Sequence, residues 1–415
     1  MEPEPEISVL DNGIRVAVEP MPGARSAVIV FRFAFGAKDD PIDRLGIARI
    51  AEDTAFKGTP TRDAHAIFDA FDNLGVRRGS ATGVEYTEFQ AQVLPRHLRE
   101  VLALYCEVFR TAAFPDDQVE VSKALTQEEL KRLEDNPAQQ VLYLTHQAGL
   151  GDPLGRMPMG NPETVAAIGA GGVRNFWAEQ CQPGRLILSV AGGLEAAEVM
   201  DTAAEVLGEW SGDEVVEEEP HRVSVASRSI HHHKQSEQAH IGMVFGAVPR
   251  GHELYYAGNV AVSVLSGGGS SRLFTEVREK RGLAYSVGAF YRSRRGGGMI
   301  SLYAGTTADR AEETLSVCQG EIDRLGRDVT QEELNRAKTV IGGRLATTGD
   351  LPEGRAGSLS EDVFLEGKAR SVSEITAGVN CVTLDQIPAY LEAFPPRPVA
   401  LVALGPKPLT GMDTT

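Results

Sequence analysis

The sequence predicts an α+β protein of two homologous halves. Each half is expected to be a sandwich, with an antiparallel-rich sheet and helices packed on one face of it. One reason is that strand-like apolar segments follow each other closely, as at 14–20 (IRVAVEP) and 26–36 (SAVIVFRFAFG). Such spacing favours antiparallel neighbours over a regular alternation of strands and helices. Two long helical stretches, near 96–110 and 116–135, supply a packing layer.

A second reason is an internal repeat. LTQEELKR begins at Leu125, and VTQEELNR begins 204 positions later at Val329. Each half closes with an apolar strand that runs into glycine, RLILSVAGG at 185–193 and PVALVALG at 398–405. Each half also has a helical stretch of small residues that ends at glycine. Matching features in the same order indicate a duplication.

The charged segment GDEVVEEEPHR, 212–222, is the predicted linker between the halves. It lacks apolar periodicity and contains proline, which is typical of a domain boundary. The predicted domains are therefore an N-terminal domain, 1–211, and a C-terminal domain, 223–415.

The composition excludes several classes of protein. Of 415 residues, 41 are Lys or Arg and 58 are Asp or Glu, so the net charge is −17. An acidic chain without a basic stripe is a poor ligand for nucleic acid or anionic membranes. No run approaches the ~18 apolar residues of a membrane helix. The acidic start lacks the features of a signal or transit peptide, so a cytoplasmic location is expected.

The first helix of interest is predicted from its end signals. Asp43 is the expected N-cap of a helix that begins near Arg44 or Leu45. Lys57 falls in its last turn, and Gly58 supplies the C-terminal stop.

Three charged residues of this helix share one face. Arg49, Glu52 and Asp53 have the spacing i, i+3 and i+4. Glu129 lies on another predicted helix, 76 residues beyond Asp53.

The surrounding segment, GIARIAEDTAFKGTP at 46–60, resembles the signature of the pitrilysin/insulinase family of zinc peptidases, the inverzincins. The likeness is to the branch of mitochondrial processing peptidase and its bacterial relatives. The family's typical form is GLAHFLEHMAFKGT, which carries H-x-x-E-H. LDNGIRVAVEP, EELKRLEDNP, DPLGRMPMGNPETVAAI and SGGGSSRLFTEVREKRGLAYSV also resemble family segments, so the match spans nearly the whole chain. The resemblance implies two α+β domains that enclose a chamber for peptides.

Carried onto this sequence, the family's three metal-ligand positions are Arg49, Asp53 and Glu129, and the position of its general base is Glu52. A catalytic zinc site of this kind needs two neutral imidazoles, a third ligand and an open position for water. Both imidazoles are absent. A guanidinium stays protonated and cannot ligate a cation.

Two further positions depart from the family pattern. Ser122 stands where the family has an additional acid, seven residues before the third ligand. Gly79 and Ser80 stand where the family has Asn-Ala in the strand that pairs with substrate. The departures cluster on one site, while the scaffold around it is kept.

The sequence favours a lost metal site over an atypical one. Without a metal, Glu52, Asp53 and Glu129 would be neighbouring anions whose burial is costly. The planar fork of Arg49 can pair with them and occupy the room of a metal. We therefore expect no metal in this chain, with an atypical metal site as the alternative.

The second half carries a different candidate site. Arg278 and Tyr285 lie seven residues apart in REKRGLAY, two helical turns if the helix extends that far. They match the family's Arg/Tyr pair, which the resemblance implies holds the substrate carbonyl. Both are donors suited to an oxyanion. The alternative is a surface arginine and a core tyrosine.

The resemblance implies a non-catalytic subunit of a heteromeric zinc endopeptidase. This chain would help to enclose peptide substrates and donate Arg278 and Tyr285 to its partner. The partner would be a homologous H-x-x-E-H subunit that holds the zinc in a heterodimer, and this chain would hold no cofactor. The alternatives are an autonomous metallopeptidase with an atypical site, and a structural or peptide-binding protein without a protease role.

Overall fold

The computed structural model describes residues 4–213, 219–397 and 399–414. The chain forms two compact units, each discontinuous in sequence. The first unit contains the described residues of Met1–Lys131, Arg156–Glu219 and Thr347–Ser371. The second contains Arg132–Gly155, Pro220–Ala346 and the described residues of Val372–Thr415. Each unit thus contains a segment from the other half of the sequence: 132–155 belongs to the second unit and 347–371 to the first. The predicted domains, 1–211 and 223–415, are continuous and include no such exchange. Of the predicted linker 212–222, residues 214–218 lie outside the described residues.

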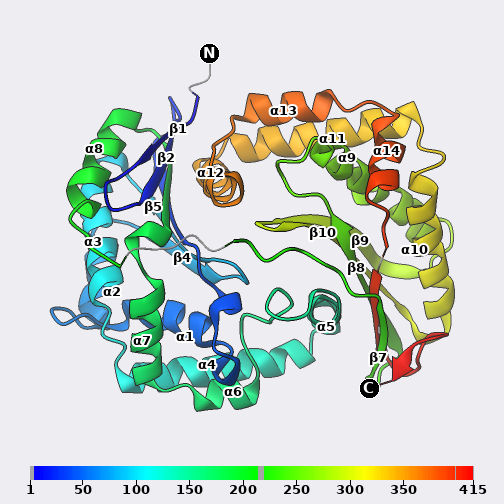
Figure 1. Ribbon diagram of the computed structural model, residues 1–415, viewed down its shortest axis with the longest axis horizontal. Coiled ribbons are helices and arrows are strands. Elements are labelled where there is room, and N and C mark those ends of the chain that lie inside the picture. Colours follow the sequence, from blue (N-terminus) through cyan, green and yellow to red (C-terminus); the bar gives the residue numbers. More distant parts are fainter. Residues whose placement is uncertain (1–3, 214–218, 398, 415) are drawn as a thin grey trace. The chain divides into compact units, whose positions relative to one another are not determined.

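The first unit is built on a six-stranded sheet in the order β1-β2-β6-β3-β5-β4 (Figure 1). Its strands are β1 (Glu6–Val9), β2 (Arg15–Pro20), β3 (Ala27–Phe33), β4 (Arg77–Thr82), β5 (Thr87–Val93) and β6 (Leu186–Gly192). All neighbours are antiparallel except β2 and β6.

The second unit has a six-stranded sheet in the order β12-β7-β11-β8-β10-β9. Its strands are β7 (Arg228–His233), β8 (Gln238–Ala247), β9 (Ala284–Arg294), β10 (Gly297–Thr307), β11 (Val399–Gly405) and β12 (Asp413–Thr414). β7 runs parallel to β11 and β12, and the other pairs are antiparallel.

The two sheets repeat one topology. In each, the last long strand in sequence inserts between two earlier strands: β6 lies between β2 and β3, and β11 lies between β7 and β8. Each sheet ends in a hairpin whose first strand, β4 or β9, lies at the edge. The predicted α+β class and duplication are confirmed, and RLILSVAGG and PVALVALG occupy equivalent strands.

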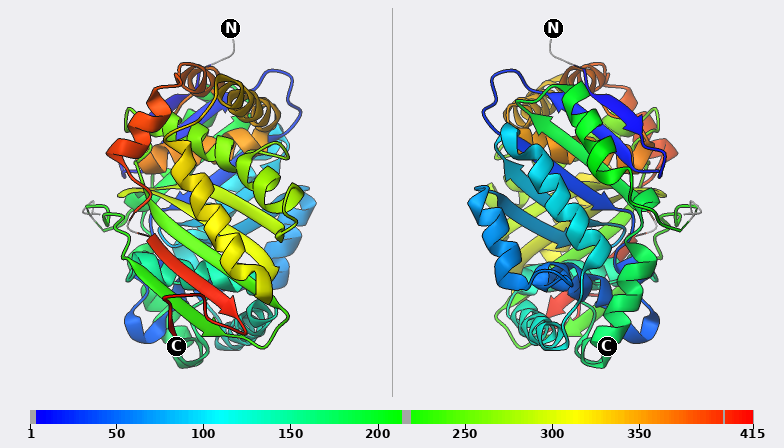
Figure 2. Two further views of the ribbon diagram at one scale, coloured as in Figure 1. Left: turned by 90° about the vertical axis from the view of Figure 1, so that its right-hand side faces the viewer. Right: turned by 90° about the vertical axis from the view of Figure 1, so that its left-hand side faces the viewer.

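Helices cover both faces of each sheet. Those of the first unit are α1 (Ile47–Thr54), α2 (Ala64–Asn73), α3 (Leu98–Thr111), α4 (Asp116–Glu134, ending in the exchanged segment), α6 (Pro162–Ala167), α7 (Ala170–Gln180), α8 (Ala196–Leu207) and α12 (Pro352–Glu366). Those of the second are α5 (Pro137–Leu150), α9 (Tyr255–Ser266), α10 (Ala311–Leu325), α11 (Gln331–Gly349), α13 (Val372–Asn380) and α14 (Gln386–Ala393). Figure 2 shows α3 and α8 across the first sheet, and α10 across the second.

The expectation of helices on one face only is wrong, because the exchanged helices cover the other face. On one face of the first sheet, Ile29 and Phe31 of β3 join the main core. On the other face, Val28 and Val30 pack with Ala356 of α12. In the second unit, α5 packs on β8 and β11, on the side away from α9 and α10 (Figure 1).

One buried ion pair joins α12 to the first sheet, and a second joins the residues after α12 to the helix itself. Arg355 Nε donates to Glu19 Oε1 of β2 at 2.8 Å. Arg370, just after α12, donates to Asp362 at 2.7 Å. All four side chains are buried. Within the described residues, no helix has both the length and the apolar composition needed to cross a membrane.

Candidate functional site

The N-terminus of α1 is held by Asp40 rather than by Asp43. The carboxylate of Asp40 accepts the backbone N–H groups of Gly46 at 2.7 Å and Ala48 at 3.0 Å. Asp43 instead lies in a short 3₁₀ turn, Ile42–Arg44, with an exposed side chain. Gly46 has φ of 97°, a left-handed conformation that turns the chain sharply into the helix.

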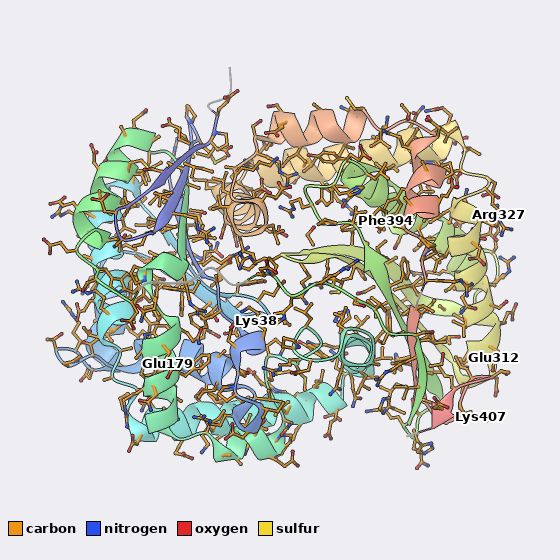
Figure 3. All side chains as sticks on the ribbon, viewed as in Figure 1. Lys38, Glu179, Glu312, Arg327, Phe394 and Lys407 are labelled. Carbon is orange, nitrogen blue, oxygen red and sulfur yellow. The ribbon has the colours of Figure 1, made fainter. Side chains whose placement is uncertain are left out.

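A second side chain, Arg156, anchors the segment before α1 through its carbonyl groups. One guanidinium nitrogen of Arg156 donates to the carbonyls of Ala37, Lys38 and Asp40 at 2.7 to 3.1 Å. Lys38, labelled in Figure 3, lies on this segment. Burial raises the pKa of Asp40 to about 7, although the two backbone donors and Arg156 oppose the shift. These contacts fix where α1 begins.

Helix α1 ends at Thr54 and continues as a 3₁₀ turn, Ala55–Lys57, that Gly58 caps. The predicted stop at Gly58 is therefore confirmed.

The three carboxylates of the candidate site surround Arg49. Arg49 Nη1 lies 3.1 Å from Glu52 Oε2 and 3.7 Å from Asp53 Oδ1. Its Nη2 lies 3.8 Å from Oε2 of Glu129 on α4. The ion pairs predicted for this guanidinium are confirmed. The Arg49 side chain is 24% exposed and that of Glu52 is 3% exposed, so the cluster is partly shielded from water.

Glu52 also contacts the edge strand β4. The hydroxyl of Thr82 donates to Glu52 Oε2 at 3.3 Å. Burial raises the pKa of Glu52, and Arg49 opposes that shift. Thr82 was missed by sequence reasoning. The alternation of β4 places Thr82 on the same face as Ser80, but it does not specify the contact with Glu52.

The residues present do not fit a zinc ion. The ligand positions offer two carboxylates and no imidazole, and the Arg49 guanidinium lies where a cation would have to sit. Across the described part of the chain, no group of three or more His, Cys, Asp or Glu side chains is arranged to hold a metal.

Gly79 and Ser80 lie where the resemblance placed a substrate-pairing strand. Both are exposed on β4, which pairs with β5 at the edge of the sheet. A Cβ atom built at Gly79 would meet no atom within 4 Å. Crowding at the Cβ position therefore does not require a glycine here.

Arg278 and Tyr285 lie together in the second unit, but not on one helix. A short π-helical turn, Phe274–Glu279, carries Arg278 and ends before Gly282, whose φ is 57°. Tyr285 is the second residue of β9, so the helix does not extend as far as Tyr285. The guanidinium carbon of Arg278 lies 5.3 Å from the Tyr285 ring centroid and 4.9 Å from that of Phe274. Tyr285 is 85% exposed, so the alternative of a core tyrosine is wrong.

Family models match both halves of the chain. The model described as Insulinase (Peptidase family M16) matches residues 15–162, which include the Arg49 cluster. The model described as Peptidase M16 inactive domain matches residues 168–341, which include Arg278 and Tyr285.

Relatives match over almost the full length. An uncharacterized zinc protease of Bacillus subtilis is 30% identical over 95% of this chain and 97% of its own. An uncharacterized zinc protease of Streptomyces coelicolor is 30% identical over 96% and 89%.

Two solved structures share the fold. A protease from Helicobacter pylori has a TM-score of 0.89 at 17% identity, over 98% of this chain and 100% of its own. A peptidase M16 inactive domain from Pseudomonas fluorescens has a TM-score of 0.88 at 21% identity, over 98% and 99%. The 30% identity to the B. subtilis protein over nearly the full length, together with the family models, shows that the chain belongs to the insulinase family, peptidase family M16.

Proposed function

We propose that this chain is a non-catalytic subunit of a heteromeric zinc endopeptidase of the insulinase family. It binds peptide together with a homologous chain that carries H-x-x-E-H and the zinc. It donates Arg278 and Tyr285 to the partner's active site. The observation that carries the proposal is the set of ion pairs from Arg49 to Glu52, Asp53 and Glu129.

This cluster is unsuited to catalysis in the chain itself. A general base must reach the proton that it abstracts, directly or through one water. The Glu52 carboxylate is 3% exposed and already engages Arg49 and Thr82. The Glu52 carboxylate is therefore occupied by contacts within this chain and has little access to a water molecule that it could deprotonate.

Arg278 and Tyr285 keep chemistry that peptide hydrolysis can use. A guanidinium and a phenol are both donors, and an oxyanion is stabilised by donors that are already in place. Tyr285 is exposed and its ring lies against Arg278, so each side chain helps to orient the other. In our proposal these donors act on a substrate held at the partner's metal.

The descriptions of two relatives are consistent with a role in zinc-dependent proteolysis. The B. subtilis and S. coelicolor proteins are both described as zinc proteases. In our proposal the zinc of the complex belongs to the partner, because the donor set of this chain does not fit it. We propose that the complex works in the cytoplasm, without nucleic-acid or membrane partners.

Reconstitution tests the proposal. The chain is mixed with a homologous H-x-x-E-H chain from the same organism, and cleavage of an unstructured peptide library is measured. We expect activity from the assembled pair and none from this chain alone. The double variant Arg278→Ala/Tyr285→Phe should lower turnover of the pair by ~10²–10³-fold or more. Arg281→Ala is the matched control, because its ion pair with Glu276 is exposed on the same segment.

Other outcomes identify the alternatives. Metal-dependent cleavage by this chain alone would identify an autonomous metallopeptidase with an atypical site. Full activity of a pair shown to contain the double variant would leave a structural or peptide-binding role.

A further inference from the structure

Two side chains of β4, Arg78 and Thr82, contact other side chains of the first unit. Arg78, Ser80 and Thr82 are alternate residues of the strand, so they lie on one face of the sheet. In the register with β5, Arg78 and Ser80 lie opposite Ala91 and Phe89, which belong to the core. These three side chains therefore point towards the helices rather than away from them.

Different partners hold the two ends of the strand. The guanidinium of Arg78 stacks on aromatic rings, 4.5 Å from the centroid of Phe71 and 4.8 Å from that of Phe68. Burial lowers the pKa of Arg78. At the other end, the hydroxyl of Thr82 donates to the carboxylate of Glu52 on α1 at 3.3 Å. Glu52 thus connects the site helix to the edge strand.

The composition of β4 makes such anchors necessary. Its sequence is RRGSAT, in which Gly79 and Ala81 have low strand propensity. It lies at the edge of its sheet, where β5 is its hydrogen-bonded neighbour. An exposed edge strand with few apolar contacts opens at low free-energy cost. The side chains on its inner face must therefore supply much of its order.

We propose that Glu52 is a positioning residue that clamps β4 against α1, so that the outer backbone edge of β4 is ordered before an extended peptide pairs with it. Peptides that add a strand to a sheet edge bind through main-chain hydrogen bonds. An edge that is already ordered reduces the entropy lost on binding. This inference rests on the proposed peptide-binding function, but its first readout does not depend on any peptide.

The clamp makes a different chemical demand from a general base. A base must be a carboxylate that can take up a proton, whereas the clamp needs only an oxygen that accepts from Thr82. Glu52→Gln keeps such an oxygen, and Glu52→Ala removes it. The two variants therefore separate the roles.

Hydrogen–deuterium exchange of the free chain is the first experiment. We expect Thr82→Val and Glu52→Ala each to speed exchange of the β4 amides by about tenfold, the usual effect of losing a hydrogen bond to a charged group. Thr82→Ser and Glu52→Gln should keep most of the protection. Asp53→Asn is the control, because Asp53 also pairs with Arg49 but has no hydrogen bond to β4 among the described residues.

Peptide cleavage by the reconstituted pair is the second readout. Thr82→Val should raise KM several-fold and leave kcat unchanged, as expected for loss of uniform binding. Unchanged β4 exchange in Thr82→Val, or equal effects of Glu52→Gln and Glu52→Ala, would overturn the clamp. If no peptide is bound or cleaved by any assembled pair, the proposed function fails, whereas the exchange data on the free chain still decide whether the clamp exists.

Discussion

Arg49 and Glu52 lie one turn apart on α1, with 3.1 Å between a guanidinium nitrogen and a carboxylate oxygen. The Glu52 side chain is nearly buried, whereas Arg49 keeps about a quarter of its surface in contact with solvent. The same guanidinium reaches Asp53 and Glu129, so one cation compensates three anions. This arrangement explains how a helix face with the charges of a metal site is stable when the metal-binding imidazoles are missing.

Arg49→Ala should lower the free energy of unfolding by about 1–3 kcal/mol. The expected cost lies between that of breaking a buried pair, ~3–5 kcal/mol, and that of an exposed pair, ~0–1 kcal/mol, because the cluster is only partly shielded. Thermal and urea unfolding measure it. Adding Glu52→Gln should recover part of the loss, because the uncompensated buried charge is then removed. An unchanged melting temperature in Arg49→Ala would mean that the guanidinium does not hold the cluster together.

We expect His146 of α5 to make the free energy of unfolding depend on pH. Its Nε2 lies 2.8 Å from the hydroxyl of Ser301. Burial, with help from Arg294 and Arg292, lowers its pKa from 6.5 to about 4. The native ring is thus neutral where the unfolded ring takes up a proton. Its contribution to stability is complete above pH ~6.5 and is lost as the pH falls towards 4.

Between pH 6.5 and 4, His146 should lower the free energy of unfolding by up to about 3 kcal/mol. Urea unfolding at several pH values would measure it. In His146→Gln the decline between pH 6.5 and 4 should be shallower by this amount. A decline of equal slope in the variant and the original chain would assign the acid sensitivity to other groups.

Because each unit includes a helix from the other half of the sequence, we expect each half of the chain to need the other half in order to fold. A fragment that ends at residue 213 lacks α12, so Val28, Val30 and Ala191 would lose their cover on one face of the sheet. We expect this fragment to be poorly folded alone and to refold when mixed with a fragment that begins at residue 219. Circular dichroism and binding of a hydrophobic dye would follow this. Cooperative unfolding of the first fragment by itself would contradict the expectation.

Local sequence spacing predicted much of the site. Helical periodicity predicted that Arg49, Glu52 and Asp53 share one face of a helix, and the family resemblance predicted that Glu129 lies beside them. The repeat predicted two equivalent sheets. The exchange of α5 and α12 was not predictable, because an apolar helix face does not specify which of two similar sheets it covers.

Other errors have local physical causes. The N-cap assignment to Asp43 failed because the chain turns at Gly46, three residues later, and brings Asp40 to the helix end. Helical spacing does not describe the pair Arg278 and Tyr285, because the left-handed conformation of Gly282 redirects the chain into β9. The contact of Thr82 with Glu52 joins residues 30 positions apart, and sequence spacing alone does not specify such pairs.

The most direct test of a non-catalytic role is the metal content of the purified chain, measured by elemental analysis after dialysis against zinc-containing buffer. The double variant Arg49→His/Asp53→His, which restores H-x-x-E-H beside Glu129, serves as the positive control and should hold about one zinc ion per chain. The account predicts no stoichiometric zinc in the unaltered chain. One tightly held zinc ion per unaltered chain would contradict it.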